Sequence, residues 1–143
     1  MQISARPDQF PPRRQPMGVR VMLLTDQPEG QTASRLASYG SLVETEAALP
    51  AALSSLLEDR IGYDLFVMDC DAFGGISAAE RAISALIAAD ARMRVMLVSA
   101  EFDSPAYPLG RRSAVCLPDA VPEGDFRYGF DHVLRDRMTA QMM

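Results

Sequence analysis

Residues 63–75 read YDLFVMDCDAFGG, and this segment decides the fold. It opens with an apolar run, Leu65 to Met68, whose length suits a strand that is buried on both faces. The run stops at Asp69 and Asp71, and the glycine pair Gly74-Gly75 follows. This change predicts the carboxyl end of a central strand in an open α/β sheet, which is the place where such sheets bind ligands.

Composition limits what the protein can be. The chain has 143 residues, of which 48% are apolar and 23% charged, as is typical of one globular domain. The net charge of −5 argues against nucleic acid as a partner, since binding phosphates requires a basic surface. All 14 basic side chains are arginines, so mechanisms that require a lysine, such as Schiff bases, are excluded.

No apolar run approaches the length of a membrane span, and the first residues lack the apolar segment of a secretory signal. We therefore expect a cytoplasmic protein that does not bind membranes. Residues 1–18 combine four prolines with three arginines and predict a flexible tail. One domain is expected over residues 19–138, with a frayed C-terminus at 139–143.

Strand and helix patterns alternate along this domain. Three further apolar runs predict strands at Val19–Leu24, Val95–Val98 and Ala114–Leu117, and Leu42–Thr45 predicts a short, more polar strand at an edge of the sheet. Between and after the strands, helical spacing of apolar residues predicts helices at 31–39, 49–61, 76–87 and 126–138. Residues 101–112 contain Pro105 and Pro108 and can hold at most a turn or two of helix.

This alternation predicts an α/β domain: a doubly wound, five-stranded parallel sheet with helices on both faces. A flavodoxin-like strand order, 2-1-3-4-5, places the three most apolar strands in the centre of the sheet. Two local details are expected as well. Ser77 and Glu80 have the spacing of a capping box for the third helix, and His132 falls off the apolar face of the last helix, which predicts an exposed histidine without a role.

The two cysteines, Cys70 and Cys116, fit no metal-binding spacing. In the predicted order one strand lies between theirs, which separates them by about two strand spacings of 4.8 Å. A disulfide requires Cα atoms within about 7 Å. We therefore predict two free thiols.

The same strand order brings Asp26, which follows the first strand, next to Asp69. Two neighbouring carboxylates repel each other, and a hard divalent cation such as Mg²⁺ relieves the repulsion. Ser99 ends the fourth strand, so its hydroxyl is expected to face the same cleft. Asp69 could attack a phosphorus centre, as carboxylates do in aspartyl-phosphate chemistry. Structural roles remain the alternatives: a helix N-cap or a turn for Asp26, a turn for Asp71, and a hydroxyl bonded to the backbone for Ser99.

From Val19 to Arg137 the chain resembles the receiver domain of two-component response regulators, the CheY-like superfamily. In that family an acidic pair ends the first strand, the phosphate-accepting aspartate ends the third, a Ser/Thr-Ala step ends the fourth, and Lys-Pro ends the fifth. The resemblance puts Asp69 at the acceptor position, Asp26 at the second acidic position and Ser99 at the Ser/Thr switch position. It implies a weak Mg²⁺ site made of Asp26, Asp69 and the backbone carbonyl of Asp71.

The chain departs from the family at three positions. Thr25 occupies the first acidic position, Phe73 stands where the family has a proline, and Leu117 occupies the lysine position. In a working receiver the phosphoryl group is thought to hold the Ser/Thr and the lysine inward, which shifts the face of the fourth helix, fifth strand and fifth helix. Without the lysine, the phosphoryl group loses a fixed positive partner.

These departures favour a stand-alone, atypical receiver-like signal-transduction protein that is not an enzyme. It is expected to act by protein–protein contact, with phosphorylation at Asp69 weak or absent. The resemblance implies a signalling partner: a histidine kinase, a phosphotransfer protein or a downstream protein. The expected contact surface is the last helix, around Phe126 to Arg137, where two copies of the chain could also pair as a homodimer.

Two alternatives stay open. One is a functional phospho-acceptor whose Asp69 is phosphorylated with the help of Mg²⁺. The other is a phosphatase of the haloacid dehalogenase type, because Asp69-Cys70-Asp71 is similar to the nucleophile motif Asp-x-Asp of that family. Against the phosphatase, that family also uses a basic residue, commonly lysine, and a later acidic pair. This chain has no lysine, and no Asp-Asp pair follows Asp71.

Overall fold

The computed structural model describes residues 18–59, 62–89, 93–108 and 113–142, with the side chains of the last helix up to Arg135. The predicted tail, apart from Gly18, lies outside the described residues, and so do the side chains of the predicted C-terminal segment 139–143. None of the described helices is long and apolar enough to cross a membrane.

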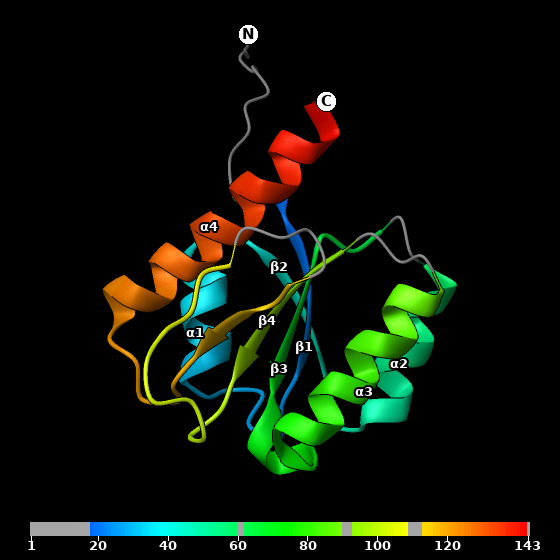
Figure 1. The fold of residues 1–143 in the computed structure, drawn as a ribbon, viewed down its shortest axis with the longest axis horizontal. Coiled ribbons are helices and arrows are strands. Elements are labelled where there is room, and N and C mark those ends of the chain that lie inside the picture. The colour runs from blue at the N-terminus through cyan, green and yellow to red at the C-terminus, as the bar shows by residue number, and fades with distance from the viewer. Residues whose placement is uncertain (1–17, 60–61, 90–92, 109–112, 143) are drawn as a thin grey trace, which may run out of the picture.

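Five parallel strands form a single sheet in the order β2-β1-β3-β4-β5 (Figure 1). The strands are β1 (Arg20–Leu24), β2 (Leu42–Glu46), β3 (Leu65–Asp69), β4 (Arg94–Val98) and β5 (Val115–Leu117). In the register, Met68 of β3 pairs with Leu24 of β1 and Leu97 of β4, so the three central strands end at one edge. This confirms the fold class predicted from the sequence.

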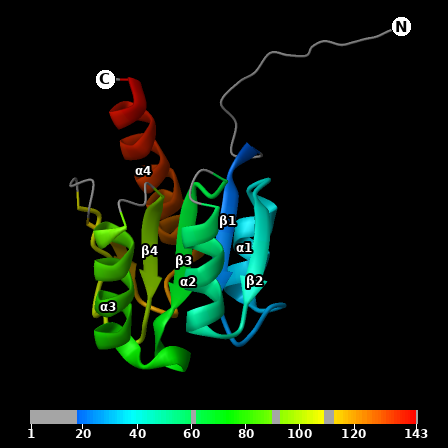
Figure 2. The same cartoon turned by 90° about the vertical axis from the view of Figure 1, so that its right-hand side faces the viewer.

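The helices form two layers around this sheet (Figure 2). They are α1 (Gln31–Ser38), α2 (Leu49–Glu58), α3 (Gly75–Ala88) and α4 (Glu123–Met142), with a 3-10 turn, η2 (Cys70–Phe73), after β3. Side chains of α1 and α4 pack on one face of the sheet, and those of α2 and α3 pack on the other.

The central strands are buried on both faces because each successive side chain points to a different layer. Leu65 and Val67 of β3 face α1 and α4, whereas Phe66 and Met68 face α2 and α3. All four are fully buried. Two apolar layers thus explain why these strands read as uninterrupted apolar runs.

Glycines set two helix boundaries. Gly40 (φ 85°) follows α1, and its N–H donates to the Ala37 carbonyl over 3.0 Å, as expected for a helix stop. Gly74 (φ 106°) and Gly75 (φ 79°) both adopt left-handed backbone angles and turn the chain directly from η2 into α3. Since α3 begins at Gly75, Ser77 lies inside the helix and the predicted capping box is wrong.

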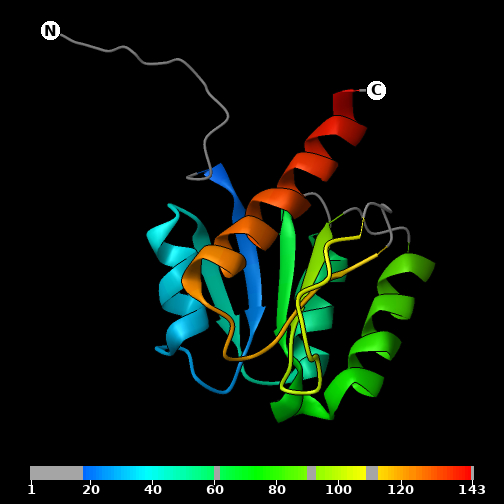
Figure 3. The ribbon, with the colours of Figure 1, turned by 60° about the vertical axis from the view of Figure 1, so that its left-hand side comes forward.

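Residues 99–108 contain no helix; they run back along β5 instead (Figure 3). Ala106 and Cys116 exchange two backbone hydrogen bonds of 2.8 and 3.0 Å in an antiparallel bridge. Pro105 lacks an N–H and cannot continue a helix, so the extended path is the one its backbone allows. The bridge pairs backbone N–H and C=O groups on the outer edge of β5. The sequence did not predict this contact.

His132 is half-buried, so the prediction of an exposed, unused histidine is wrong. Its ring lies 5.9 Å from Tyr107 and 6.1 Å from Tyr128, and the two tyrosine rings meet edge to face at 4.7 Å. The Nε2 atom lies 2.9 Å from the Pro108 carbonyl oxygen, which can only accept, so Nε2 carries the proton. We call Tyr107, Tyr128 and His132 the aromatic cluster; it ties residues 107–108 to α4.

Both cysteines are free thiols, as predicted. Cys70 is fully buried under the α2/α3 layer, and burial raises the pKa of its thiol to about 12. Burial also raises the pKa of Cys116. Neither thiol is therefore set up as a nucleophile, because the thiolate is the reactive form.

Candidate functional site

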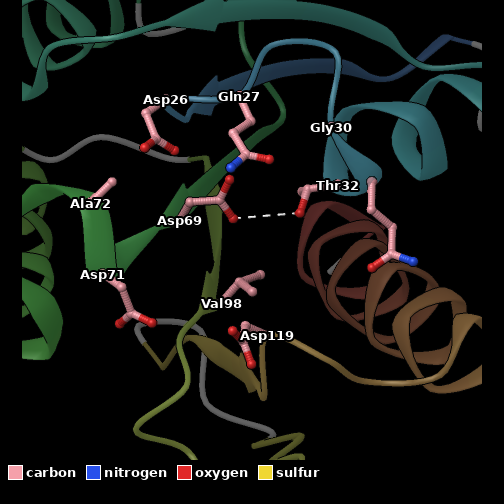
Figure 4. A pocket seen from close by; sticks show the side chains of 10 residues that line it. Asp26, Gln27, Gly30, Thr32, Asp69, Asp71, Ala72, Val98 and Asp119 are labelled. Atoms are coloured by element: carbon pink, nitrogen blue, oxygen red, sulfur yellow. Dashed lines mark hydrogen bonds between the residues drawn. The ribbon is translucent and has the colours of Figure 1, made fainter.

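A cleft of about 480 Å³ opens at the carboxyl edge of the sheet (Figure 4). It is lined by Asp26, Gln27, Gly30, Gln31, Thr32, Asp69, Asp71, Ala72, Val98 and Asp119. Four of these residues carry a carboxylate, and none of the described lining residues carries a positive charge. The cleft therefore attracts cations and repels anions.

Asp69 ends β3 at the centre of this cleft, half-buried. Its carboxylate accepts a hydrogen bond of 3.4 Å from the Thr32 hydroxyl of α1. Burial raises the pKa of Asp69, hydrogen bonds from Thr25 and Thr32 oppose the rise, and the charges of Asp26 and Asp71 add to it. The folded protein thus holds this carboxylate at a cost in free energy that its two hydroxyl partners only partly offset.

Thr25, the residue at the first acidic position, is buried and shapes the loop after β1. Its N–H donates to the Glu46 carbonyl of β2 over 2.9 Å, and its Oγ1 accepts the Gln27 N–H over 3.0 Å. This local turn leaves Asp26 exposed on the wall of the cleft. No side chain caps α1, so the alternative in which Asp26 caps a helix does not hold for α1.

Ser99 is fully buried and does not line the cleft; its hydroxyl is turned to Asp71 instead. The Ser99 Oγ donates to Asp71 Oδ1 over 2.5 Å, and the Ala100 N–H donates to Asp71 Oδ2 over 2.9 Å. The Ser99 Oγ also accepts the Glu101 N–H over 3.0 Å. The Ser99 hydroxyl, which we expected to face the cleft, is thus bonded to Asp71.

Leu117, at the lysine position, is a core residue. It is fully buried with the side chains of α1 and α4 and does not line the cleft. A carboxylate reaches the cleft from the same end of β5, because Asp119 lies two residues beyond Leu117. At the end of β5, the side chain that reaches the cleft is therefore the negatively charged Asp119, whereas Leu117 lies in the core.

The sequence prediction missed Thr32, Gln27 and Asp119 as cleft residues. Asp119 could have been found, because it follows the fifth strand at the edge that the strand order already defined. Thr32 left no signal in the sequence, since its reach to Asp69 depends on the packing angle of α1.

The donor set fits a hard cation only in part. Asp26 and Asp69 offer the carboxylate oxygens that Mg²⁺ prefers, with water to complete the shell. The Asp71 carboxylate is engaged by Ser99 and Ala100, which leaves its backbone carbonyl for a metal. In the part of the chain that the structure describes, no three His, Cys, Asp or Glu side chains are grouped as metal ligands. Asp26 and Asp69 would hold the ion.

The strand order and the two helix layers define the fold of a response-regulator receiver domain, CheY-like. A solved structure with this fold is the receiver domain of the hybrid histidine kinase CckA, with a TM-score of 0.57 and 18% sequence identity. The match covers 80% of this chain and 98% of that domain, so the likeness extends over the whole receiver fold. No protein-family model and no curated protein matches the sequence.

Proposed function

We propose that this chain is an atypical receiver-like signal-transduction protein that acts by contact with another protein. In this proposal Asp69 accepts a phosphoryl group weakly or not at all. One observation carries it: the cleft around Asp69 is lined by four carboxylates and, among the described residues, by no cationic side chain. The shared fold with a receiver domain supports the signalling role.

The reason is electrostatic. Transfer to Asp69 would bring a doubly charged anion into a cleft that is already acidic. Phosphoryl transfer depends on positioned positive groups that stabilise the developing charge. Here Leu117 lies in the core and offers none, so the whole task would fall on a cation held by Asp26 and Asp69.

The phosphatase alternative requires Asp71 to act as an acid or base beside Asp69. Both oxygens of the Asp71 carboxylate already accept hydrogen bonds, from Ser99 and Ala100. This supports a non-enzymatic function. The phospho-acceptor alternative is favoured by one observation, that Asp26 and Asp69 line the same cleft.

The partner we propose is a signalling protein: a histidine kinase, a phosphotransfer protein or a downstream protein. Phe126 and Phe130 are buried in the core, so the exposed part of the expected surface lies elsewhere on α4. Tyr128 is 50% exposed, with the Arg135 guanidinium 5.9 Å from its ring centre. We propose this part of α4 as the contact surface, including for pairing of two copies.

The deciding experiment is intact-protein mass spectrometry after incubation with acetyl phosphate and Mg²⁺, comparing wild type with Asp69→Asn. We expect no more than trace phosphorylation of either protein. Stoichiometric phosphorylation of wild type that Asp69→Asn abolishes would overturn the proposal and establish the phospho-acceptor alternative.

A second experiment tests constitutive output. Amide spectra and sedimentation profiles are recorded with and without beryllofluoride and Mg²⁺, a phosphoryl mimic. We expect unchanged spectra on α4 and an unchanged oligomeric state. Widespread amide shifts that reach α4 and disappear in Asp69→Asn would show that the switch works without its lysine.

A further inference from the structure

The Asp71 carboxylate joins two segments that lie far apart in the sequence. It comes from η2, at the end of β3, and its two oxygens accept hydrogen bonds from the first two residues after β4. Hydrogen bonds to a charged acceptor are about twice as strong as neutral ones. The exit of β4 is thus held against η2 by two bonds on a single side chain.

The bond to Asp71 engages the only proton that the Ser99 hydroxyl can donate. A hydroxyl has one proton to donate, and the Ser99 proton goes to Asp71. Ser99 is fully buried, and its oxygen accepts the Glu101 N–H at the same time. A group on Asp69 could engage Ser99 only after the bond to Asp71 had broken.

We propose that Asp71 is an internal latch that takes the place of a phosphoryl group on Asp69. Its carboxylate holds the Ser99 hydroxyl and the Ala100 N–H in one arrangement whether or not Asp69 is modified. This inference deepens the proposed function and rests on it, since a latch that needs no phosphoryl group gives constitutive output.

The latched segment continues to the outer face of α4. The Phe102 N–H bonds back to the Ser99 carbonyl over 3.2 Å, and Ala106 is bridged to Cys116 of β5. Tyr107 and Pro108 then contact α4 through the aromatic cluster. The segment from 99 to 108 is therefore anchored at Asp71 at one end and at the exposed Tyr128 surface at the other.

The experiment compares amide hydrogen exchange in Asp71→Asn and Asp119→Asn, without any phosphodonor. Each variant removes one negative charge from the same cleft, but Asp119 has no hydrogen-bond partner among the described residues. Asp71 is exposed, so its substitution leaves the core intact. We expect Asp71→Asn to speed exchange of the Ala100 and Glu101 amides about tenfold or more, the effect of losing bonds to a charged group. Smaller increases should extend to Tyr107 and to Tyr128 on α4.

Ser99→Ala provides the second variant, because it removes the hydroxyl and keeps the carboxylate. It should release the Glu101 amide in the same way. The latch is overturned if Asp71→Asn leaves Ala100 and Glu101 as protected as in wild type, or if Asp119→Asn releases them equally. Failure of the proposed function can be told apart from failure of the latch. In that case acetyl phosphate would phosphorylate Asp69 in wild type, while Asp71→Asn and Asp119→Asn would still differ in the exchange of Ala100 and Glu101.

Discussion

The hydroxyl of Thr32, in the first turn of α1, donates a hydrogen bond of 3.4 Å to the carboxylate of Asp69 at the end of β3. This contact connects Asp69 to a helix on the opposite side of the cleft from Asp71 (Figure 4). Asp69 is thus placed between hydroxyl partners that favour its charged form and a buried, acidic environment that disfavours it. Because burial and the neighbouring charges outweigh the hydroxyl partners, ionising Asp69 lowers the stability of the fold, and this effect can be measured as a function of pH.

Asp69→Asn should raise the melting temperature at pH 7. The folded-state pKa of Asp69 lies above its ordinary value of 3.8, so the native protein binds more protons there than the unfolded chain. Wild-type stability therefore falls as the pH rises from 3.8 through the raised pKa, and the variant lacks this loss. Thermal unfolding at several pH values checks this; the gain should shrink toward zero below pH 3.8. A lower melting temperature for the variant at pH 7 would contradict it.

Mg²⁺ should bind weakly, because Thr25 replaces one carboxylate and the Asp71 carboxylate is engaged elsewhere. Isothermal titration should give a dissociation constant no tighter than about millimolar, or about −4 kcal/mol. Asp26→Ala should weaken even that binding, whereas Glu58→Ala, an exposed carboxylate at the end of α2, should leave it unchanged. Micromolar binding that Asp26→Ala abolishes would revive the phosphorylation switch.

Both thiols should be reduced, and Cys70 should be unreactive in the folded protein. Under denaturing, non-reducing conditions a thiol reagent should titrate two thiols per chain, matching Cys70 and Cys116. In the folded protein at pH 8, Cys116→Ser should react far more slowly than a small thiol, because burial raises the pKa of Cys70 to about 12. No titratable thiol in the monomer, or rapid labelling of folded Cys116→Ser, would show that the description of these sites is wrong.

Neighbouring leucines on α2 offer a matched test of the α2/α3 layer. Leu56 is 0% exposed and Leu57 is 37% exposed, so only the first fills the core. Leu56→Ala should lower the free energy of unfolding by about 2–5 kcal/mol through lost burial and a cavity. Leu57→Ala should cost less than about 1 kcal/mol, as surface substitutions usually do. Urea unfolding measures both, and equal losses would mean that α2 does not pack as described.

Much of the fold could be predicted from the sequence because it depends on periodicity. The runs 21–24 of β1, 65–68 of β3 and 95–98 of β4 contain only apolar residues because they pack against helices on both faces. Their alternation with helical segments predicted a parallel sheet, and the position of the three most apolar runs favoured the flavodoxin-like strand order. That order placed Asp26 and Asp69 at one edge. Each of these steps uses only local pattern and the rules of parallel sheets.

Contacts between distant side chains were decided only by the tertiary structure. Ser99 and Asp71 are 28 residues apart, and nothing in their spacing indicates that the hydroxyl bonds to Asp71 rather than facing Asp69. The contact of His132 with Pro108 and the bridge of Ala106 to Cys116 are equally invisible. A hydrogen bond forms only when the donor and acceptor atoms lie about 2.5–3.2 Å apart, a distance that must be met to within a few tenths of an ångström. Pattern places a residue on an element and at an edge; only the packed backbone and its rotamers select the partner of each polar group.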